Sequence, residues 1–161
     1  MWLFVKNVIF TLLVPATVAF FLPLTLFSQP IAWPAQWDLR SIAGIVIVGF
    51  GVAIYFWSLW AFSVIGRATP APIDAPKFVV LDGPFRYVRN PFYIGVVTAI
   101  LGEALFFADS RFAIHAAIVA LVFHLFVVLV EEPSLSQQFG ASYARYKATV
   151  GRWLPGRPYA P

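Results

Sequence analysis

Four long apolar runs, joined by polar connections, constrain the fold of this chain more than any other feature of its sequence. A helix rises about 1.5 Å per residue, so roughly 20 residues cross the 30 Å of membrane hydrocarbon. With 61% hydrophobic and only 11% charged residues, the composition excludes an ordinary soluble domain. We therefore predict an all-α, polytopic membrane protein that forms a single domain over residues 1–161. Its four transmembrane helices cover about residues 7–27, 42–65, 91–107 and 112–130.

Prolines and glycines shape the first two runs. The first run is long for a signal peptide and lacks a convincing small-residue cleavage site after it, so we expect a retained span. Pro15 and Pro23 interrupt this run and predict a kinked helix. In the second run, Gly44, Gly49 and Gly51 would let another helix approach closely, as small residues do in membranes.

A short polar turn separates the third and fourth runs and predicts an antiparallel helical hairpin. Each arm is roughly 30 Å long. Folding the hairpin therefore returns Glu131 and Glu132 to the level of residues 86–90. Glu103 and His115 lie at similar depth on the two arms, far from that level, and we expect them to form a structural pair inside the hairpin.

The tail beyond the fourth run is polar and aromatic. Its apolar residues recur at near-helical spacing and define one face: Leu135, Phe139, Tyr143, Tyr146 and Val150. This pattern is typical of an amphipathic helix at the membrane surface, and we predict a C-terminal interfacial helix rather than a fifth span.

The basic residues orient the chain in the membrane. With four spans, the N-terminus, the 66–91 connection and the tail share one side. Cytoplasmic loops carry an excess of Lys and Arg, so both termini are predicted to be cytoplasmic. The net charge of +4 reflects this topology, and we expect no nucleic-acid partner. Nine basic residues lie on that side, namely Lys6, Arg67, Lys77, Arg86, Arg89, Arg145, Lys147, Arg152 and Arg157, against Arg40 and Arg111 on the other.

Two polar clusters carry the functional signal. The first spans residues 82–95, where Asn90-Pro91 opens the third helix and Arg89 precedes it. Free N–H groups at a helix start, beside an arginine, suit an anionic group, although a plain membrane boundary explains this cluster equally well. The second cluster is Glu131-Glu132. If the fourth helix ends there, these acids face the negative end of its dipole, which favours a functional use.

The two polar clusters and the tail together form a pattern that resembles a known family. Residues 83–95 read Gly-Pro-Phe-Arg-Tyr-Val-Arg-Asn-Pro-Phe-Tyr-Ile-Gly, and Glu131-Glu132 and the Tyr-rich tail follow in order over residues 78–155. This pattern is similar to the superfamily of isoprenylcysteine carboxyl methyltransferases and phospholipid methyltransferases. The resemblance implies a multi-pass membrane enzyme that binds S-adenosylmethionine on the cytosolic side and methylates a lipidic acceptor.

The predicted cofactor site follows from that resemblance and from the chemistry of the residues. Arg89 and the N–H groups of the third helix suit the carboxylate of S-adenosylmethionine, and Glu131 and Glu132 suit its ribose or ammonium. The aromatic rings of Tyr87, Tyr93 or Trp153 suit its adenine or sulfonium. A carboxylate acceptor needs no base, whereas an amine acceptor would use Glu132 or His124. The predicted cofactor residues are Arg89, Asn90, Pro91, Tyr93, Gly95, Glu131 and Glu132; the catalytic residues are Arg152 and Glu132; and the substrate residues are Tyr143, Tyr146 and His124.

Two other functions stay open at this stage. An NADPH-dependent enzyme related to the membrane sterol reductases would share the C-terminal architecture, but no further clustered arginines offer a 2′-phosphate site. A non-catalytic subunit for membrane assembly or transport would use the acids structurally. We predict membrane lipids and a lipophilic methyl acceptor as partners, in a prokaryotic inner membrane, and no metal site. Neither the acceptor's identity nor the oligomeric state follows from the sequence.

Overall fold

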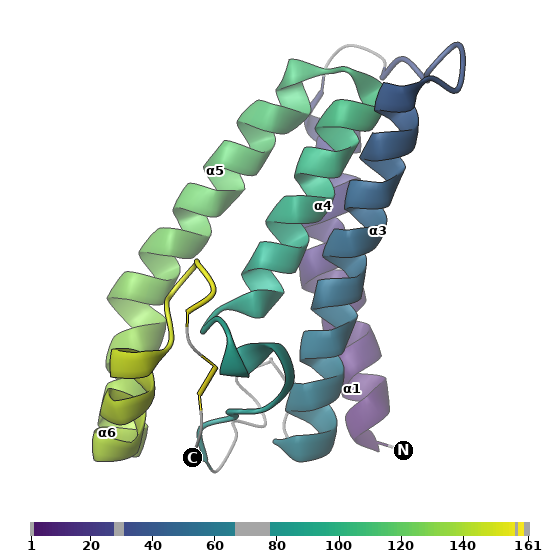
Figure 1. Ribbon diagram of the computed structural model, residues 1–161. Coiled ribbons are helices and arrows are strands. Elements are labelled where there is room, and N and C mark those ends of the chain that lie inside the picture. Colours follow the sequence, from purple (N-terminus) through teal and green to yellow (C-terminus); the bar gives the residue numbers. More distant parts are fainter. Residues whose placement is uncertain (1, 28–30, 67–77, 157, 160–161) are drawn as a thin grey trace.

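The computed structural model describes residues 2–27, 31–66, 78–156 and 158–159 and confirms the all-α fold. Three helices are long and apolar enough to cross a membrane, and α4 (Pro91–Phe107) is a shorter apolar helix. The helices alternate in direction, so that the two chain ends lie at the same end of the bundle (Figure 1). Residues 67–77, which hold Arg67 and Lys77 of the predicted cytoplasmic charges, lie outside the described residues, as does Arg157.

The first helix is irregular, as its prolines predicted. It runs as α1 (Trp2–Thr11), η1 (Leu12–Phe21) and α2 (Leu22–Leu26). The middle segment is a π-helix that contains Pro15. Proline has no N–H to donate to the α-helical ladder, and the wider π turns are one way in which a helix continues past it.

Helices α3 (Leu39–Trp60) and α4 pack backbone against backbone through small residues. A Cβ atom on Gly51 would lie 2.6 Å from the carbonyl oxygen of Gly95, and one on Gly44 would lie 2.6 Å from the backbone nitrogen of Phe106. The predicted close approach is therefore confirmed for Gly44 and Gly51. It is wrong for Gly49, which faces open space. The tight contact fixes the start of α4, where the first polar cluster lies.

The predicted hairpin of α4 and α5 (Ser110–Phe126) is present. Ala108 adopts a left-handed conformation at the end of α4, and the carboxylate of Asp109 caps α5 by accepting from the N–H of Arg111 at 2.9 Å. The predicted Glu103–His115 pair is not formed. His115 Nε2 instead lies 2.9 Å from the carbonyl oxygen of Val18, because the first helix packs against this part of α5.

The fourth helix does not end at Val130, which corrects the argument from helix-end electrostatics. It continues through the π turn η4 (Val127–Glu131) into α6 (Glu132–Thr149), and the N–H of Glu132 donates to Val127. This wide turn precedes Pro133, whose missing N–H would interrupt an ordinary α-helix. The apolar run still ends at Val130, so the two acids follow the apolar part of the helix.

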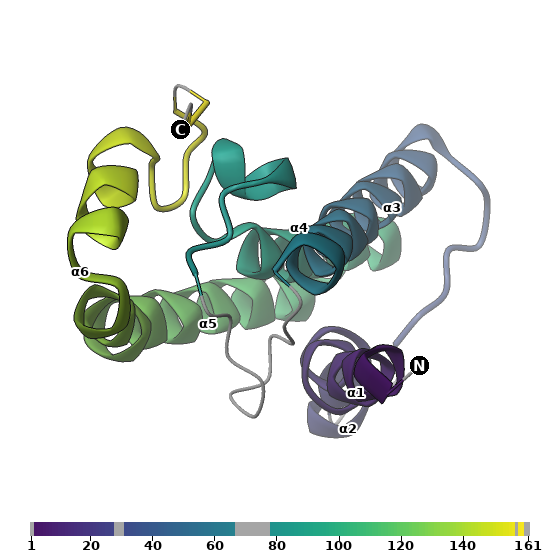
Figure 2. The same cartoon turned by 90° about the horizontal axis from the view of Figure 1, so that it is seen from below.

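A reversal inside α6 brings the tail back to the bundle. Gly140 has φ 50° and ψ −124°, a conformation that residues with a Cβ rarely adopt. Beyond it, the yellow turns of α6 fold back toward η3 (Gly83–Arg86), as seen from below in Figure 2. The predicted apolar face exists, but it packs on protein instead of lying on lipid. Its members pack together with Val79, Leu81 and Tyr159 around the buried residues Tyr143, Tyr146 and Val150.

Candidate functional site

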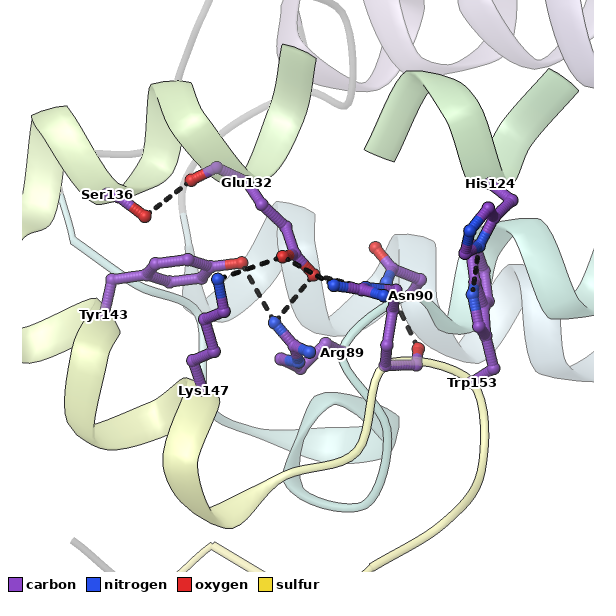
Figure 3. Close-up of polar contacts among 9 residues, drawn as sticks. Arg89, Asn90, His124, Glu132, Ser136, Tyr143, Lys147 and Trp153 are labelled. Atoms are coloured by element: carbon purple, nitrogen blue, oxygen red, sulfur yellow. Dashed lines mark hydrogen bonds and ion pairs between the residues drawn. The ribbon is translucent and has the colours of Figure 1, made fainter. Parts of the chain in front are cut away.

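Glu132 is the centre of the polar network at the end of the bundle where both chain ends lie. Its carboxylate accepts from Arg89 Nη1 at 2.8 Å and from Arg152 Nε at 2.7 Å, and Lys147 Nζ lies 3.2 Å away (Figure 3). The side chains of Glu132 and Arg89 are only 6% and 8% exposed. One carboxylate therefore joins three cations that come from the start of α4, from α6 and from the loop after it.

The loop after α6 is also bound to the start of α4 through its backbone. The N–H of Arg89 donates to Gly151 at 2.9 Å, and Asn90 Nδ2 donates to the carbonyl of Arg152 at 3.1 Å. Val88 and Gly151 form an isolated parallel bridge. These bonds, together with the ion pairs of Glu132, hold the tail over the first polar cluster.

Glu131 points away from this network although it is the neighbouring residue. Its Oε2 accepts from the hydroxyl of Tyr93 at 2.8 Å, and it lines a cavity with Arg89 and Asn90. The two adjacent acids thus have different surroundings. Glu132 is paired with cations, whereas the described residues offer Glu131 a single neutral hydrogen-bond donor.

These surroundings separate the proton affinities of the two carboxyl groups. Burial would raise the pKa of Glu132, but the hydrogen bonds from Arg152 and Lys147 and the charge of Arg89 outweigh it and lower the pKa to about 2. Burial raises the pKa of Glu131 above its ordinary value, and the charge of Glu132 adds to the rise. Glu132 is therefore an anion at neutral pH, and Glu131 is the carboxyl group better suited to exchanging a proton.

A cavity of about 140 Å³ lies beside Glu131. One end is polar and formed by Arg89, Asn90, Tyr93 and Glu131, and the rest is apolar. Arg89 Nε is buried and has no hydrogen-bond partner among the described residues. The apolar lining comes from the first helix, α3 with its continuation, η3, α4 and α5: Phe10, Val14 and Pro15; Tyr55 and Phe62; Phe85; Phe92 and Val96; and Phe123.

A second cavity, of about 240 Å³, lies between α4 and α5. Tyr93 and Phe123 line both cavities, and their ring centroids are 4.6 Å apart, so this pair separates the two volumes. The second cavity also meets His124 and Trp153, whose Nε1 donates to His124 Nδ1 at 3.0 Å (Figure 3). This bond places the tail against α5 as well as α4.

Comparisons with known proteins match a region that includes Arg89, Asn90 and Glu132. A model of the phospholipid methyltransferase family matches residues 39–142, which is more than half of the chain. The chain belongs to the phospholipid methyltransferase family. It is also 34% identical over 62 residues to an uncharacterised protein of Haemophilus influenzae, a match that covers 38% of this chain and 98% of that protein. No solved structure matches it. Enzymes of this family use S-adenosylmethionine as methyl donor.

Several residues predicted for a phospholipid methyltransferase site lie together at the polar network and its cavities. They are Arg89, Asn90, Tyr93, His124, Glu131, Glu132 and Arg152. Others serve the surrounding packing. Pro91 and Gly95 are buried, and Gly95 faces α3 rather than either cavity. Tyr143 and Tyr146 belong to the core of the tail, where the hydroxyl of Tyr146 donates to the carbonyl of Phe85 at 2.7 Å. The hydroxyl of Tyr143 also reaches the polar network, where it accepts from Arg89 Nη1 at 3.5 Å.

Sequence reasoning missed four residues of this candidate site. Lys147 follows Tyr143 by one helical turn, so the spacing alone could have placed it on the same face as the tyrosines. Phe123 precedes His124 and carried no signal in an apolar run. Phe10 and Val14 of the first helix share one face at four-residue spacing, but nothing in the sequence tied that face to the polar clusters.

Proposed function

We propose that this protein transfers a methyl group from S-adenosylmethionine to a lipidic or lipophilic acceptor, a carboxylate or an amine, at the cytoplasmic face of the membrane. Membership of the phospholipid methyltransferase family supports the reaction class. The grouping of nine basic residues on the side of both termini supports the cytoplasmic placement, in a prokaryotic inner membrane.

The observation that carries the proposal is the polar end of the 140 Å³ cavity. Arg89 and Glu131 both line this end; Arg89 Nε has no hydrogen-bond partner among the described residues, and the half-buried Glu131 accepts from one neutral donor. A guanidinium and a carboxylate side by side are complementary to a group that carries both a carboxylate and an ammonium. S-adenosylmethionine has such a group at its amino-acid end.

The cavity volume limits how much of the cofactor these residues hold. Sites that enclose a drug-sized ligand are about 300–1,000 Å³, which is larger than 140 Å³. In this proposal, Arg89 and Glu131 therefore bind the amino-acid end alone. Tyr93 and Trp153, whose ring centroids are 6.4 Å apart, offer aromatic faces for the cationic sulfonium and the adenine.

When bound, S-adenosylmethionine supplies an electrophilic methyl group to an acceptor oxygen or nitrogen that attacks in line with the carbon–sulfur bond. The chain's own contribution is alignment and exclusion of water, which the docked tail provides. An amine acceptor must also lose a proton. Glu132 is a weak base, because three cations lower its pKa, and Glu131 is assigned above to the ammonium of the cofactor, so His124 is the remaining candidate. Arg152, bonded to Glu132, acts as a positioning residue.

Calorimetry in nanodiscs tests the cofactor proposal. Glu131→Gln removes the carboxylate but keeps its shape, so S-adenosylmethionine should bind about 1.5–3 kcal/mol more weakly, which is roughly 10- to 150-fold. Glu103→Gln is the control, because Glu103 is a buried carboxyl group on α4 that does not line the cavity. Its affinity should stay within about twofold.

The outcomes decide between the proposal and a structural role for the acids. Equal affinities in Glu131→Gln and Glu103→Gln would exclude this binding mode. A wild-type protein that neither binds S-adenosylmethionine nor transfers its labelled methyl group to a bacterial lipid extract would overturn the proposed function.

A further inference from the structure

The first helix forms one wall of the 140 Å³ cavity, opposite the polar network. Phe10, Val14 and Pro15 line the cavity from that side, and Tyr55 and Val96 line it from α3 and α4. Figure 2 shows the first helix set beside the α3–α4 pair and across from the inner end of α5. All residues of this wall precede residue 39, where the match to the family model begins.

Polar contacts hold this wall in place. Asn7 Nδ2 donates to Ser63 Oγ at 2.6 Å, and the hydroxyls of Thr11 and Tyr55 lie 3.0 Å apart. Near the other end of the helix, His115 binds the carbonyl of Val18. Hydrogen bonds between helices are among the contacts that join helices in lipid, where the hydrophobic effect gives no preference for one packing. The wall is therefore a fixed part of the cavity.

Val14 lies at the mouth of the cavity. It lines the interior, yet it is 45% exposed on a face of the helix that also carries exposed Leu13. Further inside, the lining residues Tyr55 and Val96 are buried. A side chain that is half outside and half inside an apolar cavity of a membrane protein borders the route between lipid and cavity.

The cavity is polar at one end and apolar over the rest of its lining. Its inner end offers the charged groups of Arg89 and Glu131, and its other walls are apolar. The proposed function assigns this polar end to the amino-acid end of the cofactor, so the apolar remainder is the part that a hydrocarbon chain entering past Val14 can fill. The small volume admits a slender chain and not a fused ring system, because protein cavities accept extra bulk only by straining their walls.

We propose that Phe10 and Val14 determine which methyl acceptor this enzyme accepts, by fitting the first segment of its hydrocarbon chain between the first helix and α3–α4. This inference rests on the proposed function, because only that function makes the bound lipid a methyl acceptor. It assigns the selection of the acceptor to a helix that lies outside the family match.

The test compares Val14→Trp with Leu13→Trp. Leu13 is the neighbouring residue, is 67% exposed and does not line the cavity, so its variant controls for adding an indole to this helix. In nanodiscs with labelled S-adenosylmethionine and a bacterial lipid extract, the Val14→Trp variant should methylate lipids at least about tenfold more slowly than the wild type. Its affinity for the cofactor should be unchanged. Val14→Ala, which widens the mouth, should shift the products toward bulkier chains. Leu13→Trp should match the wild type in rate and product profile.

A second readout needs no turnover. A phosphatidylethanolamine with a diazirine in its acyl chain, activated by light without cofactor, should label buried Tyr55 or Val96 in the wild type and in Leu13→Trp, but not in Val14→Trp. If these residues are labelled in a protein that binds no S-adenosylmethionine, the site for the hydrocarbon chain is supported and the methyltransferase function is rejected. Active enzyme in which Val14→Trp and Leu13→Trp behave alike in both assays would overturn the inference.

Discussion

Replacing Glu132 with Gln should detach the tail from the bundle at a large cost in stability. The carboxylate and Arg89 are both almost fully buried and bonded at 2.8 Å. Gln keeps the shape but leaves the Arg89 charge buried without a counter-charge. Removing one partner of a buried ion pair costs about 3–5 kcal/mol, because the remaining charge has lost both water and its partner.

The other two cations add little to this figure. Arg152 is 30% exposed and Lys147 is 45% exposed, so water already screens much of their attraction to Glu132. Exposed ion pairs contribute about 0–1 kcal/mol. We therefore expect Glu132→Gln to lose about 3–5 kcal/mol, and Lys147→Ala, which removes one exposed partner of the same carboxylate, to lose at most about 1 kcal/mol.

Unfolding in mixed detergent micelles, followed by circular dichroism, measures both free energies. Limited proteolysis reports separately on the tail, since cleavage after Gly140 should become fast in Glu132→Gln and stay slow in Lys147→Ala. Similar losses of stability in the two variants, or a tail that stays protected in Glu132→Gln, would refute the reasoning that a buried Arg89–Glu132 pair is the main tie.

Three further predictions concern packing, pH and topology. Gly51→Leu should lose about 1–3 kcal/mol or more of stability in the same unfolding assay, because its side chain would collide with the backbone of α4, whereas Gly49→Leu, which faces open space, should be near neutral. The pKa of Glu132 is depressed from 4.5 to about 2, so its contribution is complete above pH 4.5 and is lost as the pH falls toward 2; the tail should resist proteolysis at pH 5 and lose that protection toward pH 2. Tags on the N- and C-termini should both be digested from the cytoplasmic side of sealed vesicles, and opposite sides would exclude four spans.

The helical bundle was predictable because its signals are local and strong. A run of apolar residues indicates a span regardless of its partners, and the run at residues 91–107 coincides with α4. The polar turn between the third and fourth runs predicted the hairpin correctly, and the hairpin brought Arg89 and Glu132 together over 43 residues of sequence. The glycines of the second run predicted close packing, but only the structure shows which of them face α4.

The tail and the first helix were less predictable, since their positions depend on single backbone irregularities. The apolar face from Leu135 to Val150 was found, yet lipid and protein surfaces attract such a face equally, and the reversal at Gly140 decides between them. Spacing shows which residues share a helix face but not what that face meets. For the same reason, neither the bond of His115 to Val18 nor the cavity face of Phe10 followed from the sequence.

The π turn Val127–Glu131 bears on how relatives of this protein can differ in length. A π turn accommodates one residue more than the α-helical turn that it replaces, so losing one residue of 127–130 would restore a regular helix and keep its two flanks aligned. A deletion within Ser110–Phe126 would instead rotate everything beyond it by about 100°, the angle per residue of an α-helix, and turn Glu132 away from Arg89. In an alignment of relatives, single-residue gaps in the fourth helix should therefore gather at this turn.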